Sequence, residues 1–132
     1  MLDLQAIRIQ VRSRLREQRA LVGRLLRQRE HLQGSLFPRY GLCGKANCLC
    51  RTGRRHGPYY VLSSRSAGRS TFAYLEGDDL ARARALLARH REFRRGLARL
   101  RRINGELVGL LRRYQQAAAR RGGERLGIAS EA

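Results

Sequence analysis

The sequence predicts an α+β fold that is mainly helical: two long helices forming an antiparallel, coiled-coil-like hairpin, with a small β-hairpin module between them. Residues 1–33 and 78–121 contain no proline and carry apolar residues at helical spacing. Residues 34–77 are instead rich in glycine, cysteine and β-forming side chains. A chain of 132 residues has room for these parts and little more, and residues 122–132 are expected to form a disordered tail.

The first predicted helix, at residues 1–33, is arginine-rich and amphipathic. Its apolar residues recur at intervals of three and four, a spacing that places them on one face of a helix of about eight turns. They include Leu4, Ile7, Val11, Leu15, Leu25 and Leu32. Gly34 provides the natural end of this helix, because glycine is common just beyond a helix C-terminus.

Two runs of β-forming residues predict the hairpin of the central module. They are Pro58–Ser64 and Arg69–Leu75, separated by a short stretch that includes Gly68. The run Ser35–Tyr40 offers a third strand, which has to lie at an edge because Pro38 lacks the N–H that a central strand donates.

A seven-residue repeat runs through the second predicted helix, residues 78–121, which Asp78 or Asp79 is expected to cap. One position of the repeat holds Ala83, His90, Leu97, Asn104 and Leu111, and the position three residues later holds Leu86, Phe93, Leu100, Leu107 and Tyr114. This pattern predicts a coiled-coil seam whose partner is either the first helix or, in a homodimer, a second copy of the chain. Asn104, the polar member of the seam, is expected to fix its register.

The chain is strongly basic, with a formal net charge of +19. Such a charge predicts a polyanionic partner: nucleic acid, an acidic protein surface or an anionic membrane. The alternative is a protein that is basic without a specific polyanionic ligand. Apolar runs are shorter than the ~20 residues that cross a bilayer, and the N-terminal residues lack the uninterrupted apolar stretch of a secretion signal. We therefore expect a cytoplasmic protein with no membrane partner.

Three cysteines and a histidine form the strongest chemical motif. Cys43, Cys48, Cys50 and His56 have the pattern C-x4-C-x-C-x5-H. In a reducing compartment an odd, clustered set of cysteines indicates a metal site rather than disulfides. Three thiolates and an imidazole are a complete tetrahedral set for Zn²⁺, and a site with no open position is structural. The sequence therefore predicts one structural zinc ion that stabilises a module too small to fold unaided.

Several alternatives to this site stay open. The cysteines could be free thiols of an apolar turn, and His31 or His90 could replace His56 as the fourth ligand. A nucleophilic Cys50 with His56 as its base is a further option, whereas redox catalysis is not expected without a C-x2-C pair. The acidic residues within 76–79 are better explained by the start of a helix than by a nuclease site. We therefore expect no enzymatic activity.

Residues 34–62 resemble a known group of sequences. The run GSLFPRYGLCGKANCLCRTGRRHGPYYVL is similar to a family of short, uncharacterised bacterial proteins marked by C-G-K-x-x-C-x-C and, after a short gap, H-G-P-Y-Y-x-L. The matching positions are Cys43, Gly44, Lys45, Cys48, Cys50, His56, Gly57, Pro58, Tyr59 and Tyr60. The similarity continues through a hairpin, an acidic turn and a long helix, to roughly Tyr114. Members of this family have no established activity but are often associated with transposase or integrase genes. The resemblance therefore implies a DNA-related role and a transposase or integrase partner.

Basic residues outnumber acidic ones in each long segment. Residues 1–33 hold eight arginines against three acids, residues 34–77 seven basic residues against one acid, and residues 78–121 thirteen arginines against four acids. The densest clusters, which we predict to bind nucleic acid, are Lys45, Arg51, Arg54 and Arg55 beside the cysteines and Arg94, Arg95, Arg99, Arg101 and Arg102 on the second helix. No sequence-reading DNA-binding motif is visible, so we expect binding dominated by phosphate contacts, with DNA favoured over RNA.

The sequence thus favours a zinc-stabilised, basic accessory protein that binds nucleic acid. Four aromatic residues, Tyr59, Tyr60, Phe72 and Tyr74, could stack on unpaired bases, although strand alternation is expected to direct about half of them into the core. The alternative function is a protein-interaction or dimerisation module that docks on a transposase or another acidic partner.

Overall fold

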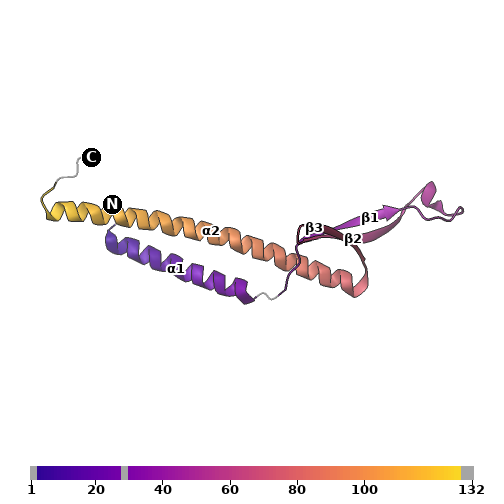
Figure 1. The fold of residues 1–132 in the computed structure, drawn as a ribbon, viewed down its shortest axis with the longest axis horizontal. Coiled ribbons are helices and arrows are strands. Elements are labelled where there is room, and N and C mark those ends of the chain that lie inside the picture. The colour runs from indigo at the N-terminus through magenta and orange to yellow at the C-terminus, as the bar shows by residue number, and fades with distance from the viewer. Residues whose placement is uncertain (1–2, 28–29, 129–132) are drawn as a thin grey trace. The chain divides into compact units, whose positions relative to one another are not determined.

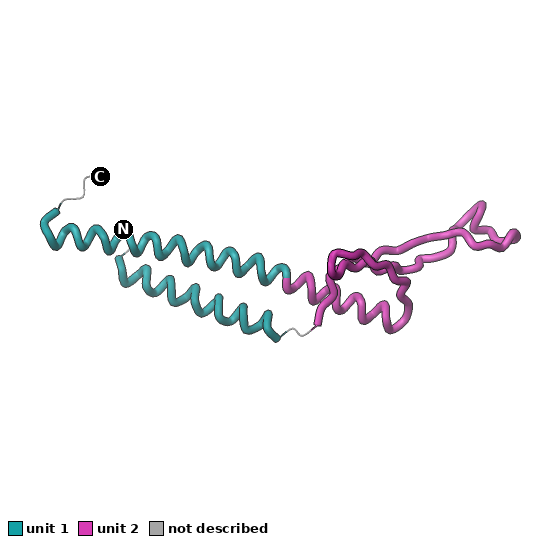
Figure 2. The backbone as a smooth tube through the Cα atoms, in the orientation of Figure 1, with its two compact units in different colours: residues 1–27, 94–132 teal, residues 28–93 magenta. Residues whose placement is uncertain are grey.

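A computed structural model of the protein describes residues 3–27 and 30–128. Its elements follow the order α1 (Leu4–Arg27), β1 (Gly34–Gly41), the short 3-10 helix η1 (Leu49–Arg51), β2 (His56–Ser66), β3 (Arg69–Leu75) and α2 (Gly77–Arg125) (Figure 1). These elements group into two compact units, each with its own contacts (Figure 2). We call residues 1–27 with 94–132 the helical unit and residues 28–93 the sheet unit, and α2 contributes to both.

The predicted fold class is wrong. The segment between the helices in the sequence is a three-stranded antiparallel sheet in the order β1-β2-β3, and not a β-hairpin. A two-stranded hairpin alone is marginally stable in water, and the third strand extends it. The two helices do not form a coiled-coil hairpin along their length either, because the first part of α2 belongs to the sheet unit. The third strand, proposed for Ser35–Tyr40, is confirmed, with Pro38 at the sheet edge.

A two-residue turn joins β2 to β3. Ser66 pairs with Arg69, and the two residues between them have positive φ, 52° at Ala67 and 78° at Gly68. Positive φ at both central residues is the signature of a type I′ turn, whose twist matches that of hairpin strands. This turn fixes the register in which β3 follows β2.

The sheet unit has a small apolar core. Among the described residues of this unit, the buried hydrophobic ones are Cys50, Val61, Leu62, Ala83 and Leu87. One face of the sheet meets the start of α2, where the guanidinium carbon of Arg84 lies 4.9 Å from the centre of the Tyr60 ring. So few buried side chains contribute little hydrophobic stabilisation, and small units of this kind usually need a further source of stability.

The start of α2 differs from the expected cap. The helix begins at Gly77, whose φ is 58°, and Asp78 and Asp79 lie in its first turn. Carboxylates in the first turn interact favourably with the partial positive charge at a helix N-terminus. The two aspartates are therefore accounted for by helix electrostatics, although neither is the capping residue.

The ends of both helices also differ from expectation. α1 ends at Arg27, residues 30–33 are not helical, and residues 28–29 lie outside the described part of the chain. α2 runs on to Arg125, into the predicted tail, of which residues 129–132 lie outside the described part. Neither helix, within the ranges that the structure describes, is long and apolar enough to cross a membrane.

In the helical unit, α1 and the later part of α2 run antiparallel. Side-chain contacts between them include Asp3 with Arg121, Arg8 with Tyr114, Gln18 with Asn104 and Arg14 with Glu106, at 3.0, 2.9, 2.7 and 3.3 Å. Apolar residues buried in this unit include Ile7, Leu21, Leu25, Ile103, Leu107 and Leu110. Gly96 permits a close approach, because a Cβ there would lie 2.5 Å from a methyl carbon of Leu25.

The predicted seven-residue seam coincides only in part with the face that α2 buries in this unit. Its member Leu107 is buried, but its members Leu97, Asn104 and Leu111 are exposed, and Ile103 and Leu110, which lie outside the repeat, are buried. An α-helix has 3.6 residues per turn, so a strict seven-residue repeat drifts by ~20° per heptad unless the helices supercoil. The residues of α2 that contact α1 therefore do not follow the seven-residue repeat along the helix. Asn104, expected to fix an apolar seam, instead accepts a hydrogen bond from Gln18 at an exposed position.

The stability of the helical unit is expected to depend on Ile7, which is 1% exposed. Ile7→Ala leaves a cavity between the helices, and we expect the free energy of unfolding to fall by roughly 2–4 kcal/mol. Ile9→Ala is the matched control, because Ile9 is 56% exposed on the same helix and its truncation should cost less than about 0.5 kcal/mol. Urea unfolding followed by circular dichroism measures both. Equal losses for the two variants would contradict the burial of Ile7.

Candidate metal centre

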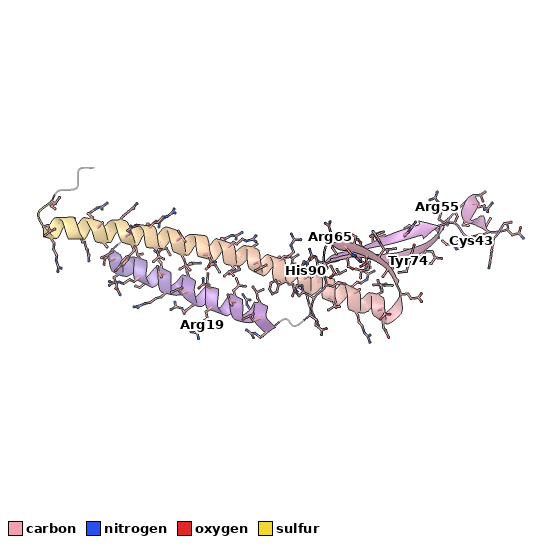
Figure 3. All side chains as sticks on the ribbon, in the orientation of Figure 1. Arg19, Cys43, Arg55, Arg65, Tyr74 and His90 are labelled. Atoms are coloured by element: carbon pink, nitrogen blue, oxygen red, sulfur yellow. The ribbon has the colours of Figure 1, made fainter. Side chains whose placement is uncertain are left out.

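The pairing of β1 with β2 brings the two ends of the cysteine loop together. We call residues 42–55 the cysteine loop; it leaves β1 at Gly41 and returns at His56, and these two residues are paired across the strands. Antiparallel strands place the end of one beside the start of the next. Cys43 therefore lies next to His56 in space, and Figure 3 shows Cys43 and Arg55 together at this end of the two strands.

Hydrogen bonds within the cysteine loop position the other two cysteines. The N–H of Cys48 donates to the carbonyl of Lys45 at 3.3 Å, and the N–H of Gly53 donates to the carbonyl of Leu49 at 2.7 Å. The same carbonyl accepts a 3.1 Å bond from the N–H of Thr52, which closes the 3-10 helix η1 that contains Cys50. Cys50 is buried, with 3% of its surface exposed, whereas Cys48 is half-buried.

The four predicted ligands meet in one cluster. The sulfurs of Cys43, Cys48 and Cys50 and a ring nitrogen of His56 all lie within 4.8 Å of one another. The Cys43 and Cys50 sulfurs are 3.6 Å apart, and the Cys48 sulfur is 3.0 Å from Nε2 of His56. A disulfide needs about 2.05 Å between sulfurs, whereas a tetrahedral site with metal–sulfur bonds of about 2.3 Å separates its sulfurs by about 3.8 Å. The four residues therefore lie close enough to hold a metal ion.

The pKa values of two thiols in this cluster are shifted in opposite directions. The pKa of Cys48 is lowered to about 7 by a hydrogen bond from the backbone N–H of Cys50, by the thiols of Cys43 and Cys50, and by His56. The N–H of Lys45 lowers the pKa of Cys43, but the Cys48 contact, burial and Cys50 outweigh it and raise that pKa above its usual range. Sulfurs this close cannot all ionise without a cation between them. A divalent ion fits the donor set because it would take the place of the shared protons.

The two other histidines lie elsewhere. His31 and His90 contact each other through their Nδ1 atoms at 2.7 Å, and their rings are stacked with centroids 4.9 Å apart. The ring of His31 also stacks on Phe93. Within residues 3–27 and 30–128, no second cluster of three or more possible metal ligands occurs. His56 is thus the histidine that completes the set, and the alternative fourth ligands are excluded by their positions.

Comparison with known sequences assigns the chain to a family. Residues 10–85 match the family described as a domain of unknown function, DUF6788. The chain belongs to this family. The DUF6788 match contains all three strands and the complete cysteine loop, and it ends within α2. No curated protein and no solved structure is similar to the chain.

The predicted nucleic-acid-binding residues are all exposed but do not form a single described surface. Lys45, Arg51, Arg54 and Arg55 belong to the cysteine loop of the DUF6788 domain, and Arg94, Arg95, Arg99, Arg101 and Arg102 belong to the helical unit. None of the nine forms an ion pair with another residue that the structure describes. Their positive charges are therefore available to an external partner.

Two exposed residues of the edge strand β1 were not among the predicted site residues. Phe37 and Arg39 lie on β1 and pair with Val61 and Tyr59 of β2. Both are exposed, and Arg39 donates a 3.1 Å hydrogen bond to the hydroxyl of Tyr74. The sequence signal for them was the proposed edge strand Ser35–Tyr40. Successive residues of a strand point to opposite faces, so residues 37 and 39 of such a strand lie on the same face.

Gly57 of the DUF6788 domain is expected to be required for the metal centre. It follows His56, its φ is 128°, and a Cβ there would lie 2.7 Å from the backbone oxygen of Arg39. Gly57→Ala should displace His56 and weaken metal affinity by about 10-fold or more, as changes beside metal ligands commonly do. Cobalt(II) titration, followed by its thiolate charge-transfer absorption, measures this affinity. Gly44→Ala is the control, because a Cβ at Gly44 meets nothing within 4 Å. Identical titrations for both variants would contradict the prediction.

Proposed function

We propose that the protein is a zinc-stabilised, strongly basic nucleic-acid-binding accessory protein. The observation that supports the metal is the cluster of three thiols and one imidazole, whose ligand atoms lie within 4.8 Å of one another. Thiolate and imidazole ligands in a tetrahedral set favour zinc among the common biological metals. Four protein ligands leave no position for water or substrate, so the ion acts as a structural crosslink.

The composition of the cysteine loop supports a structural role for the ion. Cys50 is the buried hydrophobic residue of this loop, whereas Leu42 and Leu49 are 57% and 79% exposed. Apolar burial therefore contributes little to holding the loop in place. Metal coordination supplies folding free energy in small modules of this kind, because a preformed site does not exist in the unfolded chain.

Charge supports nucleic acid as the partner. The net charge is +19, and the nine exposed basic residues of the two predicted clusters lack acidic partners among the described residues. Lys45, Arg51, Arg54 and Arg55 surround a zinc centre whose three thiolates would leave it with one net negative charge, so the loop remains positive overall. DNA is preferred over RNA, and a link to a transposase or integrase is proposed, on the resemblance of residues 34–62 to proteins associated with such genes.

A second function, as a dimerisation or protein-docking module, is favoured by one observation on α2. Leu97, Val108 and Leu111 are 37%, 48% and 54% exposed, and the helical spacing puts them on one side of α2, interrupted by the polar Asn104. A second copy or an acidic protein partner could cover these residues. Light scattering at several protein concentrations distinguishes this function, because it requires a dimer or a partner complex, whereas phosphate binding does not.

We expect purified protein to contain one zinc ion per chain and His56→Ala to lose it. Removing the imidazole leaves three thiols and an open coordination position, which weakens a structural site. Elemental analysis measures the zinc, and amide hydrogen exchange of residues 42–55 measures the order of the loop. His31→Ala is the matched control, because His31 contacts His90 and lies outside the cluster. Full zinc content in His56→Ala would remove that residue from the ligand set.

We expect DNA binding to weaken steeply with salt and with charge reversal on α2. Each phosphate contact on duplex DNA adds about 0.9 to the slope of log affinity against log salt. The double variant Arg101→Glu, Arg102→Glu should reduce both the affinity and this slope, the latter by about 1 to 2. Arg101→Lys with Arg102→Lys keeps the charge and is the control. No mobility shift of the wild-type protein at low salt would reject nucleic-acid binding.

A further inference from the structure

We infer that the face of the sheet opposite Tyr60 binds unpaired bases of a single-stranded nucleic acid. This inference rests on the proposed nucleic-acid function and names the kind of nucleic acid and the surface that reads it. The surface, which we call the aromatic face, consists of Phe37 and Arg39 from β1, Tyr59, Val61 and Ser63 from β2, and Phe72 and Tyr74 from β3.

Strand register places these side chains on one face. Directly paired residues of antiparallel strands point to the same side of a sheet, and residues two apart on one strand do so as well. Phe37 pairs with Val61, and Val61 pairs with Tyr74, which gives a row across all three strands. Phe72 follows on the same side of β3, opposite Ser63. The bond from Arg39 to the Tyr74 hydroxyl, 3.1 Å long, spans the face from one edge strand to the other.

The opposite face is already occupied. Tyr60 and Leu62 alternate with Tyr59 and Val61 along β2 and therefore point the other way. Arg84 of α2 lies over the Tyr60 ring, and Leu62 is 9% exposed. Tyr60 is thus partly occupied by α2, whereas Tyr59, Phe72 and Tyr74 of the aromatic face are exposed.

The rings of the aromatic face are exposed to an unusual degree. Phe72 is 70% exposed, Tyr74 is 65% and Tyr59 is 52%, while Val61 at the centre is 3% exposed. Val61 therefore serves as core on this side, and the four rings, including Phe37 at 39% exposed, lie around it at the surface. Contiguous exposed apolar side chains on a soluble unit indicate a binding surface. Flat rings presented by a sheet match the flat faces of nucleobases.

Charge decides which occupant the aromatic face suits. Arg39 lies on the face, and Arg65 continues it along β2, paired with Ser70 (Figure 3). Residues 34–77 carry seven basic residues and one acid, Glu76. Rings interleaved with arginine suit a partner that offers flat bases for stacking and phosphates for the positive charges. A single strand with splayed bases offers both. Bases of a duplex are stacked inside the helix and cannot meet the rings.

A pocket adjoins the aromatic face. Its volume is about 450 Å³, and its walls include Tyr59 and Tyr74 of the aromatic face, Tyr60 of the opposite face and Leu80 of α2, with Glu76 as its one acidic residue. Sites for small ligands commonly measure about 300–1,000 Å³, so one base can enter while its neighbours stack on the exposed rings. Two aromatic residues thus belong to both the flat face and the pocket.

The test compares three fluorescein-labelled probes with the full-length, zinc-loaded protein. The probes are an oligothymidylate of about 15 nucleotides, in the size range that single-strand binders occupy, a matched oligomer of abasic sites, and a hairpin duplex. Fluorescence anisotropy gives the affinities, and tyrosine emission reports stacking directly. We expect the oligothymidylate to bind tightest and to quench tyrosine emission, and the abasic oligomer to bind more weakly without quenching.

Phe72 is the residue to change, because a side chain that is 70% exposed contributes little to the core. Phe72→Ala should weaken binding of the oligothymidylate by roughly 5- to 150-fold, the range for loss of one base–aromatic stack. Duplex binding, which depends on phosphates, should stay within about twofold. Phe72→Leu keeps apolar bulk without the flat ring and should behave like Phe72→Ala. Leu26→Ala is the control, since it removes a 78% exposed apolar side chain from α1.

The outcomes separate this inference from the proposed function. Wild-type protein that binds duplex and single strand equally, with no effect of Phe72→Ala and no quenching, overturns the inference and leaves phosphate binding intact. Phe72→Ala that converts a dimer to a monomer without changing oligothymidylate affinity assigns the face to a second copy and also overturns it. No binding of any probe at low salt rejects the proposed function and the inference together.

Discussion

The pairing of Gly41 with His56 is the constraint on which the sheet unit depends. It holds the two ends of the cysteine loop at one point, so a segment with little apolar burial of its own needs only a local crosslink to become ordered. Three sulfurs and one imidazole meet there. Because β2 begins at His56, the same ion would also fix the first residue of the central strand. Coordination of an ion and strand pairing would therefore stabilise each other in this domain.

The cluster of possible metal ligands was predictable because it depends on chemistry that is local in the sequence. All four residues fall within residues 43–56, and their side-chain types are those that bind zinc in many different folds. The spacing left the choice among His56, His31 and His90 open, since a histidine on a helix can reach a loop in many folds. Only the strand register, which puts His56 opposite Gly41, decides among them.

The arrangement of the helices was not predictable in the same way. A seven-residue repeat states which residues could share a face, but the face that a helix buries depends on whether it supercoils and on what it meets. Here α2 meets a sheet over one part and α1 over another, so Leu107 is buried and Leu111 is not. The three strands were readable from composition, yet the number in the sheet rested on a proline-containing run that sequence alone could not assign. The coiled-coil seam and the two-stranded hairpin were both wrong about contacts between elements. The helices and strands themselves were predicted largely where the structure has them.

Pro38 has a consequence for how the protein behaves in solution. An open sheet edge normally presents a row of N–H and C=O groups that can template the addition of a foreign strand. β1 forms one edge of this sheet, and Pro38 removes a donor from the middle of it. The edge is therefore a poor template for self-association into fibrils, although it lies beside a surface of exposed rings. By closing this edge to strand addition, Pro38 also keeps the neighbouring exposed rings from being drawn into an aggregate.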